Sequence, residues 1–470
     1  MPINSFLYPG AKVTTAYEVA NSCRFQDSDS SEMSRAIAST GSNTTWTVSA
    51  WVKRVELGQS SPIFGTGDGN ANNDARMVFF DADDKIECSY YNSGYTYEVT
   101  TNRVFRDISA WYHICILFDT TESTSTDRIK IYVNGTQETS FATSSYPSED
   151  ATFNFGNTSY THYVNDMGGR NIRGSHYIAE LVYLDGTALA VTNFGEFDSD
   201  SPTIWKPKDV SGLSSSKGVN GFYMDFEDSS NLGNDVWGGT DFTESNLDAQ
   251  NQSTDTCTNN FATWNSLFRK GTTTPAFAEG NLKSTFDDSG ANEFALTTFG
   301  VSSGKWYAEV KWTSATGTGA TATGILDMAY SGTADPNNAV TNAFGYFGNG
   351  NKNVSGTASS YGNSYTTGDI IGIAIDMDNN KLYFSKNGTF QDSGDPTSGS
   401  TGTGAISIIS GVTYGIFTSD YNNKVAELNT GSPAYSISSG NADGNGYGNF
   451  EYSVPSGYYS LNTKNLAEYG

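Results

Sequence analysis

The sequence predicts an all-β protein made of two β-sandwich domains, and composition is the first reason. Aromatic residues make up 13% of the 470 residues, charged residues only 16%, and 50 glycines punctuate the chain. Tyr, Phe, Val and Ile between Gly, Asn and Asp turns are typical of sandwiches and barrels. No window shows a sustained 3.6-residue apolar period with caps, so helices should be scarce.

Two similar strand–turn–strand units are the second reason. In residues 368–390, isoleucines at 371, 373 and 375 alternate with small residues, as in a strand with one buried face. The Asp and Asn residues of 376–380 favour a turn, and Asn387-Gly388 is the dipeptide that a type I′ hairpin prefers. Residues 111–135 follow the same plan and end in Asn134-Gly135. Each unit predicts a β domain of its own.

Taken in order, the chain divides into four parts. Residues 1–20 hold no periodic pattern and are either a frayed terminus or an attachment arm. The first domain should span 21–198, with strands expected at 46–54, 63–64, 76–80, 85–91, 95–100, 111–119, 128–134 and 177–186.

Residues 199–259 form an expected connector. Phe222, Met224 and Phe226 alternate with Tyr223 and Asp225, which predicts at least one strand that packs against either domain or bridges them. The second domain should span 260–470, with further strands expected at 305–312, 343–346, 414–417 and 427–429.

Charge and terminal sequence limit the partners. The net charge is 26 − 51 = −25, which argues against a nucleic-acid backbone or an anionic membrane as partner. The first residues lack a signal-peptide core, and no apolar run reaches the length of a membrane span. The four cysteines form no close-spaced set, and Cys115 lies in an apolar strand, so we expect buried free thiols and no structural disulfide.

Catalytic patterns are weak. The three histidines, at 113, 162 and 176, show no metal-ligand spacing, and His113 lies in a core-like strand. Gly300–Gly304 matches G-x-S-x-G, but a nucleophile elbow needs a following helix and here a strand is expected. Glu180 and Asp185 are five residues apart, so strict alternation would place them on opposite faces of a strand. We therefore expect no enzyme activity.

The two halves resemble known domain families. The motifs CRFQDSDSSEMSRA, WTVSAWVKR, WYHICILFD with IKIYVNG, and YIAELVYLDGTAL occur in the order found in laminin-G-like, concanavalin-like jelly rolls. GKWYAEV, FGY, GDIIGIAIDMDNNKLYFSKNGTF and GVTYGIF resemble the central strands of the SPRY domain, a β-sandwich used as a binding module. The resemblance implies two sandwiches and transfers no catalytic residue.

The sequence contains candidate residues for a calcium site and for an aromatic ligand-binding surface. Laminin-G-like domains often hold calcium at a rim, and oxygen-rich loops here contain Asp27 and Asp29, and Asp68 and Asp74. The second loop is no EF-hand, because it lacks the sixth-position glycine and has Phe79 at the twelfth. Aromatic side chains that could stack on a sugar or fill a protein interface are Tyr91, Tyr95, Tyr97, Tyr361 and Tyr365.

A laminin-G-like sandwich, then KPKD and NGFYMDF, then a SPRY domain ending in FEYSVPSGYYSLNTKNL resembles large virion proteins of marine bacteriophages. This resemblance implies a non-enzymatic tail-fibre or other surface-exposed component, made in the host cytoplasm and displayed on the particle exterior. Its expected partners are other virion proteins, further copies of itself in a homo-oligomer, and a glycan or protein of the host surface, without nucleic acid or membrane insertion. The alternatives are an architectural decoration or adaptor protein and a polysaccharide-degrading enzyme.

Overall fold

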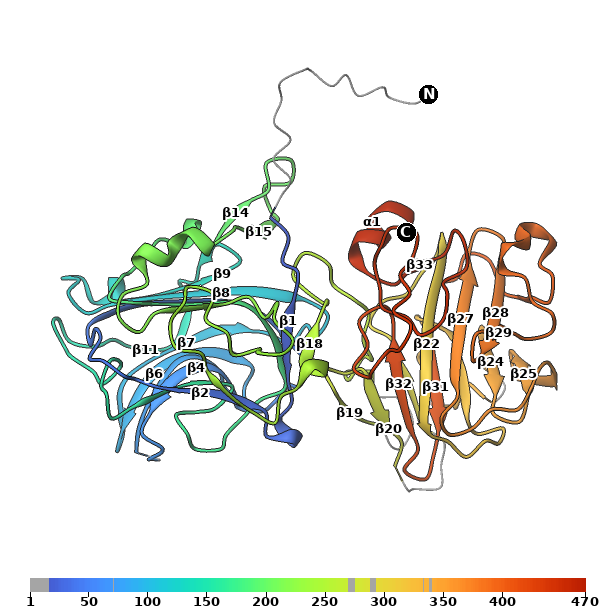
Figure 1. The fold of residues 1–470 in the computed structure, drawn as a ribbon, viewed down its shortest axis with the longest axis horizontal. Helices are drawn as coiled ribbons and strands as arrows, with labels where there is room; N and C mark the ends of the chain where they lie inside the picture. The colour runs from blue at the N-terminus through green and yellow to red at the C-terminus, as the bar shows by residue number, and fades with distance from the viewer. Residues whose placement is uncertain (1–16, 71, 269–274, 288–292, 333, 338–339) are drawn as a thin grey trace, which may run out of the picture.

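Two β-sandwiches lie side by side along the long axis of the molecule (Figure 1). The computed structural model describes residues 17–470 except 71, 269–274, 288–292, 333 and 338–339. Residues 1–16 of the expected arm therefore lie outside the described part. The all-β prediction is confirmed, since the described residues contain one α-helix, α1 (Thr463–Tyr469), and otherwise short 3-10 turns.

The first sandwich consists of two eight-stranded sheets. One sheet runs β10 (Thr136–Gln137), β9 (Ile129–Val133), β8 (Trp111–Asp119), β3 (Thr45–Arg54), β13 (His176–Asp185), β1 (Ser22–Phe25) and β18 (Gln252–Ser253), with β16 (Phe222–Met224) also paired to β13. The other runs β11 (Phe141–Ser145), β7 (Tyr95–Val104), β6 (Lys85–Asn92), β5 (Asn73–Phe80), β4 (Ser61–Gly67), β12 (Thr161–Val164), β2 (Glu32–Ala36) and β17 (Thr243–Ser245).

The second sandwich pairs a nine-stranded sheet with a six-stranded one. The larger sheet runs β19 (Ala276–Ala278), β20 (Lys283–Thr285), β32 (Val425–Asn429), β22 (Lys305–Ser314), β27 (Ile370–Asp376), β28 (Lys381–Lys386) and β29 (Thr389–Phe390), with β30 (Ile406–Ser407) on β28 and β33 (Tyr459–Ser460) on β22. The smaller runs β21 (Glu293–Leu296), β31 (Tyr414–Asp420), β23 (Ala322–Asp327), β24 (Ala343–Phe347), β25 (Asn351–Val354) and β26 (Thr357–Ser360).

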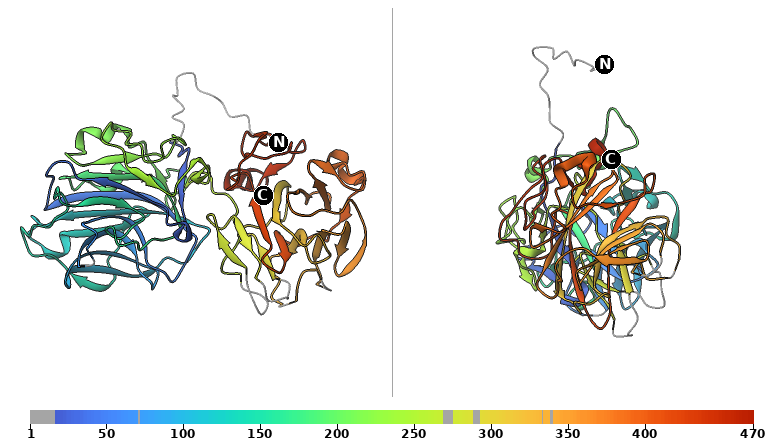
Figure 2. Two further views of the ribbon diagram at one scale, coloured as in Figure 1. Left: turned by 60° about the horizontal axis from the view of Figure 1, so that its bottom comes forward. Right: turned by 90° about the vertical axis from the view of Figure 1, so that its right-hand side faces the viewer.

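Remaining short elements connect these sheets. A two-stranded ribbon joins β14 (Gly195–Phe197) to β15 (Trp205–Pro207). The 3-10 turns are η1 (Asp27–Asp29), η2 (Ser125–Asp127), η3 (Val191–Asn193), η4 (Ser211–Ser216), η5 (Ala249–Asn251) and η6 (Pro396–Thr401). Figure 2 shows α1, at the red end of the chain, on the side of the second sandwich nearest the first.

Both Asn-Gly turns have the predicted geometry. Asn134 and Gly135 have φ of 48° and 74°, and Asn387 and Gly388 have 47° and 80°, as a type I′ turn requires of both central residues. Gly135 is also needed for space, because a Cβ there would lie 2.2 Å from the Trp205 ring. Glycine at this turn therefore lets the segment after the first jelly roll pack against it.

The segment 199–259 belongs to the first sandwich. Its strands β16, β17 and β18 pair with β13, β2 and β1, so both sheets of that sandwich gain strands from it. Phe222 and Met224 are fully buried in the core between the sheets. Sequence reasoning left open which domain this segment joins, and the pairing resolves that question.

A buried ion pair joins the end of this segment to the sheet. Lys53 Nζ lies 2.7 Å from Asp255 Oδ2, and both side chains are almost completely buried. The same ammonium donates to Asn260 Oδ1 and to the carbonyl of Phe261, where the second domain begins. Trp111 Nε1 donates to the other carboxylate oxygen of Asp255. The ion pair thus fixes the chain at the point where it leaves one sandwich for the other.

Candidate functional site

Three of the five tyrosines proposed as ligand contacts are core residues. Tyr97 is fully buried, and Tyr361 and Tyr365 are 6% and 1% exposed. Tyr365 donates its hydroxyl to the carbonyl of Tyr346, and Tyr361 accepts from the backbone N–H of Phe384. The loop that carries the last two folds back over the core, so the expectation of a ligand-facing role is corrected for all three.

Tyr91 and Tyr95 do reach the surface, where Arg76 holds them. Their rings meet edge to face with centroids 5.3 Å apart. The Arg76 guanidinium lies 5.7 Å and 5.5 Å from the two centroids, and it donates a 2.9 Å hydrogen bond to the Tyr95 hydroxyl. Tyr95 is 48% exposed. These three residues, here called the tyrosine–arginine patch, present fixed aromatic rings to solvent.

Beneath the patch, buried polar groups of β6 hold Arg76 in place. Arg76 also donates to Glu87 Oε1 at 3.2 Å, and the Ser89 hydroxyl donates to the same oxygen at 2.6 Å. Burial raises the pKa of Glu87. The side chains of β5 and β6 alternate, so the core takes Ala75 and Tyr90 while Arg76 and Tyr91 lie on the other face. Sequence reasoning missed Arg76, although its period-2 spacing from Asp74 placed both on one face.

Of the four aspartates expected at calcium loops, one is buried in ion pairs and the other three are exposed. Asp74 is buried between two guanidinium groups, 2.8 Å from Arg170 and 3.7 Å from Arg76, so it serves as their counterion, which corrects the expectation for this residue. Asp27 and Asp29 are exposed in η1, and Asp68 accepts from Asn70 and Asn73 within its own loop. In the described part of the chain, no three His, Cys, Asp or Glu side chains converge as a metal site would require.

Two catalytic patterns have structural explanations. His113 is fully buried, accepts at Nδ1 from Trp205 Nε1 and therefore donates at Nε2 to the Ser49 hydroxyl, while burial lowers its pKa to about 3. Gly300–Gly304 is followed by strand β22, as expected, rather than by the helix of a nucleophile elbow.

All four cysteines are free thiols, and Cys115 is fully buried.

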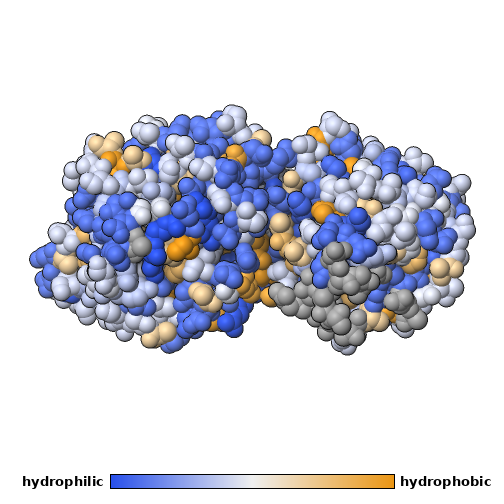
Figure 3. Space-filling view, turned by 90° about the horizontal axis from the view of Figure 1, so that it is seen from below, coloured by the Kyte–Doolittle hydropathy of each residue, from blue (hydrophilic) through white to orange (hydrophobic). Residues whose placement is uncertain are grey.

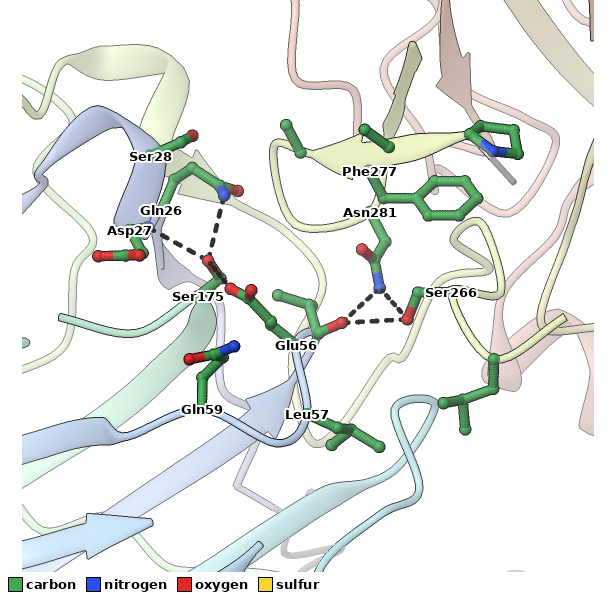
Figure 4. Close-up of a pocket in the computed structure, with 15 residues that line it drawn as sticks. Gln26, Asp27, Ser28, Glu56, Leu57, Gln59, Ser175, Ser266, Phe277 and Asn281 are labelled. Carbon is green, nitrogen blue, oxygen red and sulfur yellow. Dashed lines mark hydrogen bonds between the residues drawn. The ribbon is translucent and has the colours of Figure 1, made fainter. Parts of the chain in front are cut away.

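A groove of about 660 Å³ lies where the two sandwiches meet (Figure 4). Its first wall carries a chain of hydrogen bonds in which Gln26 Nε2 donates to Ser175 Oγ and Ser175 Oγ donates to Glu56 Oε2, at 3.1 and 2.9 Å. Its second wall is formed by Ala276, Phe277 and Ala278 of β19 with Leu267 and Asn281. Figure 3 shows hydrophobic residues along this junction between the halves.

Hydrogen bonds across the junction hold the two walls in place. Asn281 Nδ2 and the Ser266 hydroxyl both donate to the carbonyl of Val55, at 3.0 and 3.2 Å. Nearby, the Tyr177 hydroxyl donates to the carbonyl of Gly280 at 2.9 Å. Since each bond joins one sandwich to the other, the groove is a preformed feature of the pair.

Glu180 and two tyrosine hydroxyls form a separate polar cluster at a β-bulge in β13. Glu180 has a φ of 51°, and the register of β13 on β3 shifts between Ala179 and Val182. Its Oε2 accepts from the hydroxyls of Tyr223 and Tyr17, at 2.8 and 3.1 Å. Burial first, and then Asp225 and Glu227, raise the pKa of Glu180 to about 8.

This cluster predicts a pH-dependent stability. A carboxyl whose folded pKa exceeds its unfolded value stabilises the fold below the unfolded pKa and loses that contribution as pH rises towards the folded one. Between about pH 4.5 and pH 8, Glu180 should therefore cost on the order of 4 kcal/mol of stability. Melting temperatures across this range should fall less for Glu180→Gln than for the native chain. The exposed-site variant Glu122→Gln should retain the native slope, and equal slopes in all three proteins would contradict the prediction.

Comparison with known proteins identifies both domains. Residues 27–170 match the family model described as the concanavalin A-like lectin/glucanases superfamily, and residues 305–407 match that of the SPRY domain. The chain thus contains a concanavalin-like domain followed by a SPRY domain, the two β-sandwich families expected from its motifs.

Solved structures include similar SPRY domains. The SPRY domain of human HERC1 is 19% identical, with 31% of this chain and 87% of that chain covered and a TM-score of 0.25. Another human SPRY domain is 16% identical, with 31% and 90% covered and a TM-score of 0.24. The search of curated proteins found no match. No helix in the described residues has the length and apolar character needed to span a membrane.

Proposed function

We propose that this chain is a non-enzymatic structural protein of a bacteriophage virion, a tail-fibre or other surface-exposed component that recognises a glycan or protein of the host surface. The observation that carries the recognition role is the tyrosine–arginine patch of Arg76, Tyr91 and Tyr95. Both domain families found in the chain are compatible with binding.

The patch has the chemistry of a saccharide platform. An exposed aromatic ring covers the C–H face of a sugar, while neighbouring hydroxyl and guanidinium groups bond its hydroxyls. Arg76 contacts both rings and bonds Tyr95, so little side-chain freedom remains to be lost on binding. A protein ligand rich in hydroxyl or apolar groups would use the same features.

Tyr95→Ala and Tyr91→Ala should each weaken binding to host polysaccharide by about tenfold, which corresponds to roughly 1.4 kcal/mol and is within the range of one aromatic contact. The measurement is a glycan array of host polysaccharides followed by calorimetric titration of the best binder. Tyr421→Ala, at a partly exposed ring in the other domain, is the matched control and should bind as the native chain does. Binding unchanged in both patch variants would exclude the patch.

One observation favours the alternative of a polysaccharide-degrading enzyme. Asp27 and Glu56 both line the groove between the two sandwiches. Two carboxyl groups that face a bound glycosidic bond are the machinery of most glycosidases. We propose binding without cleavage, so host polysaccharide incubated with the chain should release no reducing ends. Release that disappears in Glu56→Gln would establish a hydrolase instead.

The virion assignment rests on two features. The order of the two domains resembles that of bacteriophage virion proteins, and the acidic net charge keeps an exposed surface soluble. In this proposal the chain assembles as a homo-oligomer with other virion proteins, because symmetry multiplies weak contacts into avidity. Locating the chain in intact particles tests this. A chain that is present in virions but binds nothing on the array would be an architectural decoration or adaptor.

A further inference from the structure

The wall of the interdomain groove formed by the second sandwich is the end of a β-sheet. Among the residues that the structure describes, β19 is the terminal strand of the nine-stranded sheet and pairs with β20. All three of its residues line the groove, and two of them are alanines. Antiparallel strands exchange backbone bonds at alternate residues only, so a terminal strand presents its remaining N–H and C=O groups along the free edge. Small side chains leave that backbone accessible.

The opposite wall carries negative charge. Among the described residues that line the groove, Asp27 and Glu56 are acidic and none is basic. Both residues are exposed. Glu56 is oriented by the hydroxyl of Ser175, which also accepts from the backbone N–H of Asp27 at 3.2 Å. A ligand in this groove should therefore present positive charge towards the first sandwich.

A buried amide in the same wall lacks a partner. Gln26 is 7% exposed and donates its amide nitrogen to Ser175, yet its side-chain oxygen has no hydrogen-bond partner in the described part of the protein. Figure 4 shows this amide on the side of the groove facing Phe277 and Asn281. An unpaired buried amide oxygen costs free energy that an incoming N–H donor would recover.

We propose that the groove binds an extended basic peptide segment of a partner protein, which pairs with the free edge of β19 and directs Lys or Arg side chains to Asp27 and Glu56. Main-chain hydrogen bonds supply affinity in this mode of recognition, and the alternate side chains supply specificity. Phe277 and the 50% exposed Leu267 offer apolar contact to residues between the basic ones. This site is separate from the tyrosine–arginine patch and does not depend on it.

The probe is a fluorescent ten-residue peptide of alternating Val and Lys, titrated into the full-length chain by anisotropy. Replacing its Lys residues by Glu should abolish binding. The double variant Asp27→Asn/Glu56→Gln should weaken binding by about tenfold, the expected loss for two exposed charge pairs. The double variant Glu122→Gln/Asp200→Asn removes two exposed acids outside the groove and should bind like the native chain.

A second probe separates strand pairing from charge attraction alone. N-methylation of the central backbone amides keeps every side chain and charge but removes the N–H groups that pair with β19. This peptide should bind at least tenfold more weakly if β19 accepts it as a strand. Any of three results would overturn the proposal. The methylated peptide could bind as tightly as the unmethylated one, or Asp27→Asn/Glu56→Gln could bind the peptide as tightly as the native chain. Neutral oligosaccharides such as maltoheptaose could also displace the peptide.

Discussion

Asp255→Ala is expected to lower the free energy of unfolding of the first sandwich by about 3–5 kcal/mol, the cost of leaving a buried charge without its counterion. Lys53 Nζ would keep Asn260 Oδ1 and the Phe261 carbonyl, two neutral acceptors, and the indole N–H of Trp111 would lose its acceptor. A loss of this size lowers the melting temperature of a domain of about 240 residues by roughly 10 °C. Differential scanning calorimetry of the full chain measures it directly.

The control removes both charges. Lys53→Met/Asp255→Leu leaves no unpaired ion, so it should lose much less stability than Asp255→Ala, as is found when apolar residues replace buried ion pairs. Asp84→Ala offers a second comparison, because it unpairs the fully buried Arg54 within the first sandwich. If Asp255→Ala melts within a degree or two of the native chain, the ion pair does not stabilise the junction.

Hydrophobic period and turn chemistry predicted many of the longer strands, although β23, inside the six-stranded sheet, was not among them. β8 and β22 were expected nearly at their observed bounds, because each alternates over nine or ten residues, and Asn-Gly fixed both hairpin turns. The strands of 199–259 are two or three residues long, too short for a period. Their partners lie far away in sequence, so their domain was not predictable from local pattern.

The tyrosines show why exposure was harder to predict than strands. Tyr95 and Tyr97 are two residues apart and should share a face, yet one is 48% exposed and the other is fully buried. The register shifts by one residue between the Tyr90–Tyr97 and Tyr91–Tyr95 pairs, which turns Tyr95 to the outer face beside Tyr91. No composition signal marks this bulge. The groove could not be predicted from the sequence either, because residues of both sandwiches line it.

A fragment of residues 1–200 is expected not to fold, whereas 1–260 should melt cooperatively. A cut at residue 200 removes the three strands that pair with β13, β2 and β1, together with five apolar side chains of the first core: Phe222, Met224, Phe226, Leu232 and Phe242. At about 1.5–3 kcal/mol for each buried side chain, the loss is roughly 10 kcal/mol, comparable with the whole stability of a domain.

The cut at residue 200 also removes the partners of a buried arginine. Arg35 packs its guanidinium 4.9 Å and 4.6 Å from the rings of Phe222 and Phe242 and lies 3.6 Å from Asp235, all of which the shorter fragment lacks. Thermal unfolding followed by near-ultraviolet circular dichroism should therefore show a sharp transition for 1–260 and none for 1–200. Residues 261–470, which carry the second core, serve as the control and should melt cooperatively alone. A cooperative transition of 1–200 at the temperature of 1–260 would show that 199–259 is a connector after all.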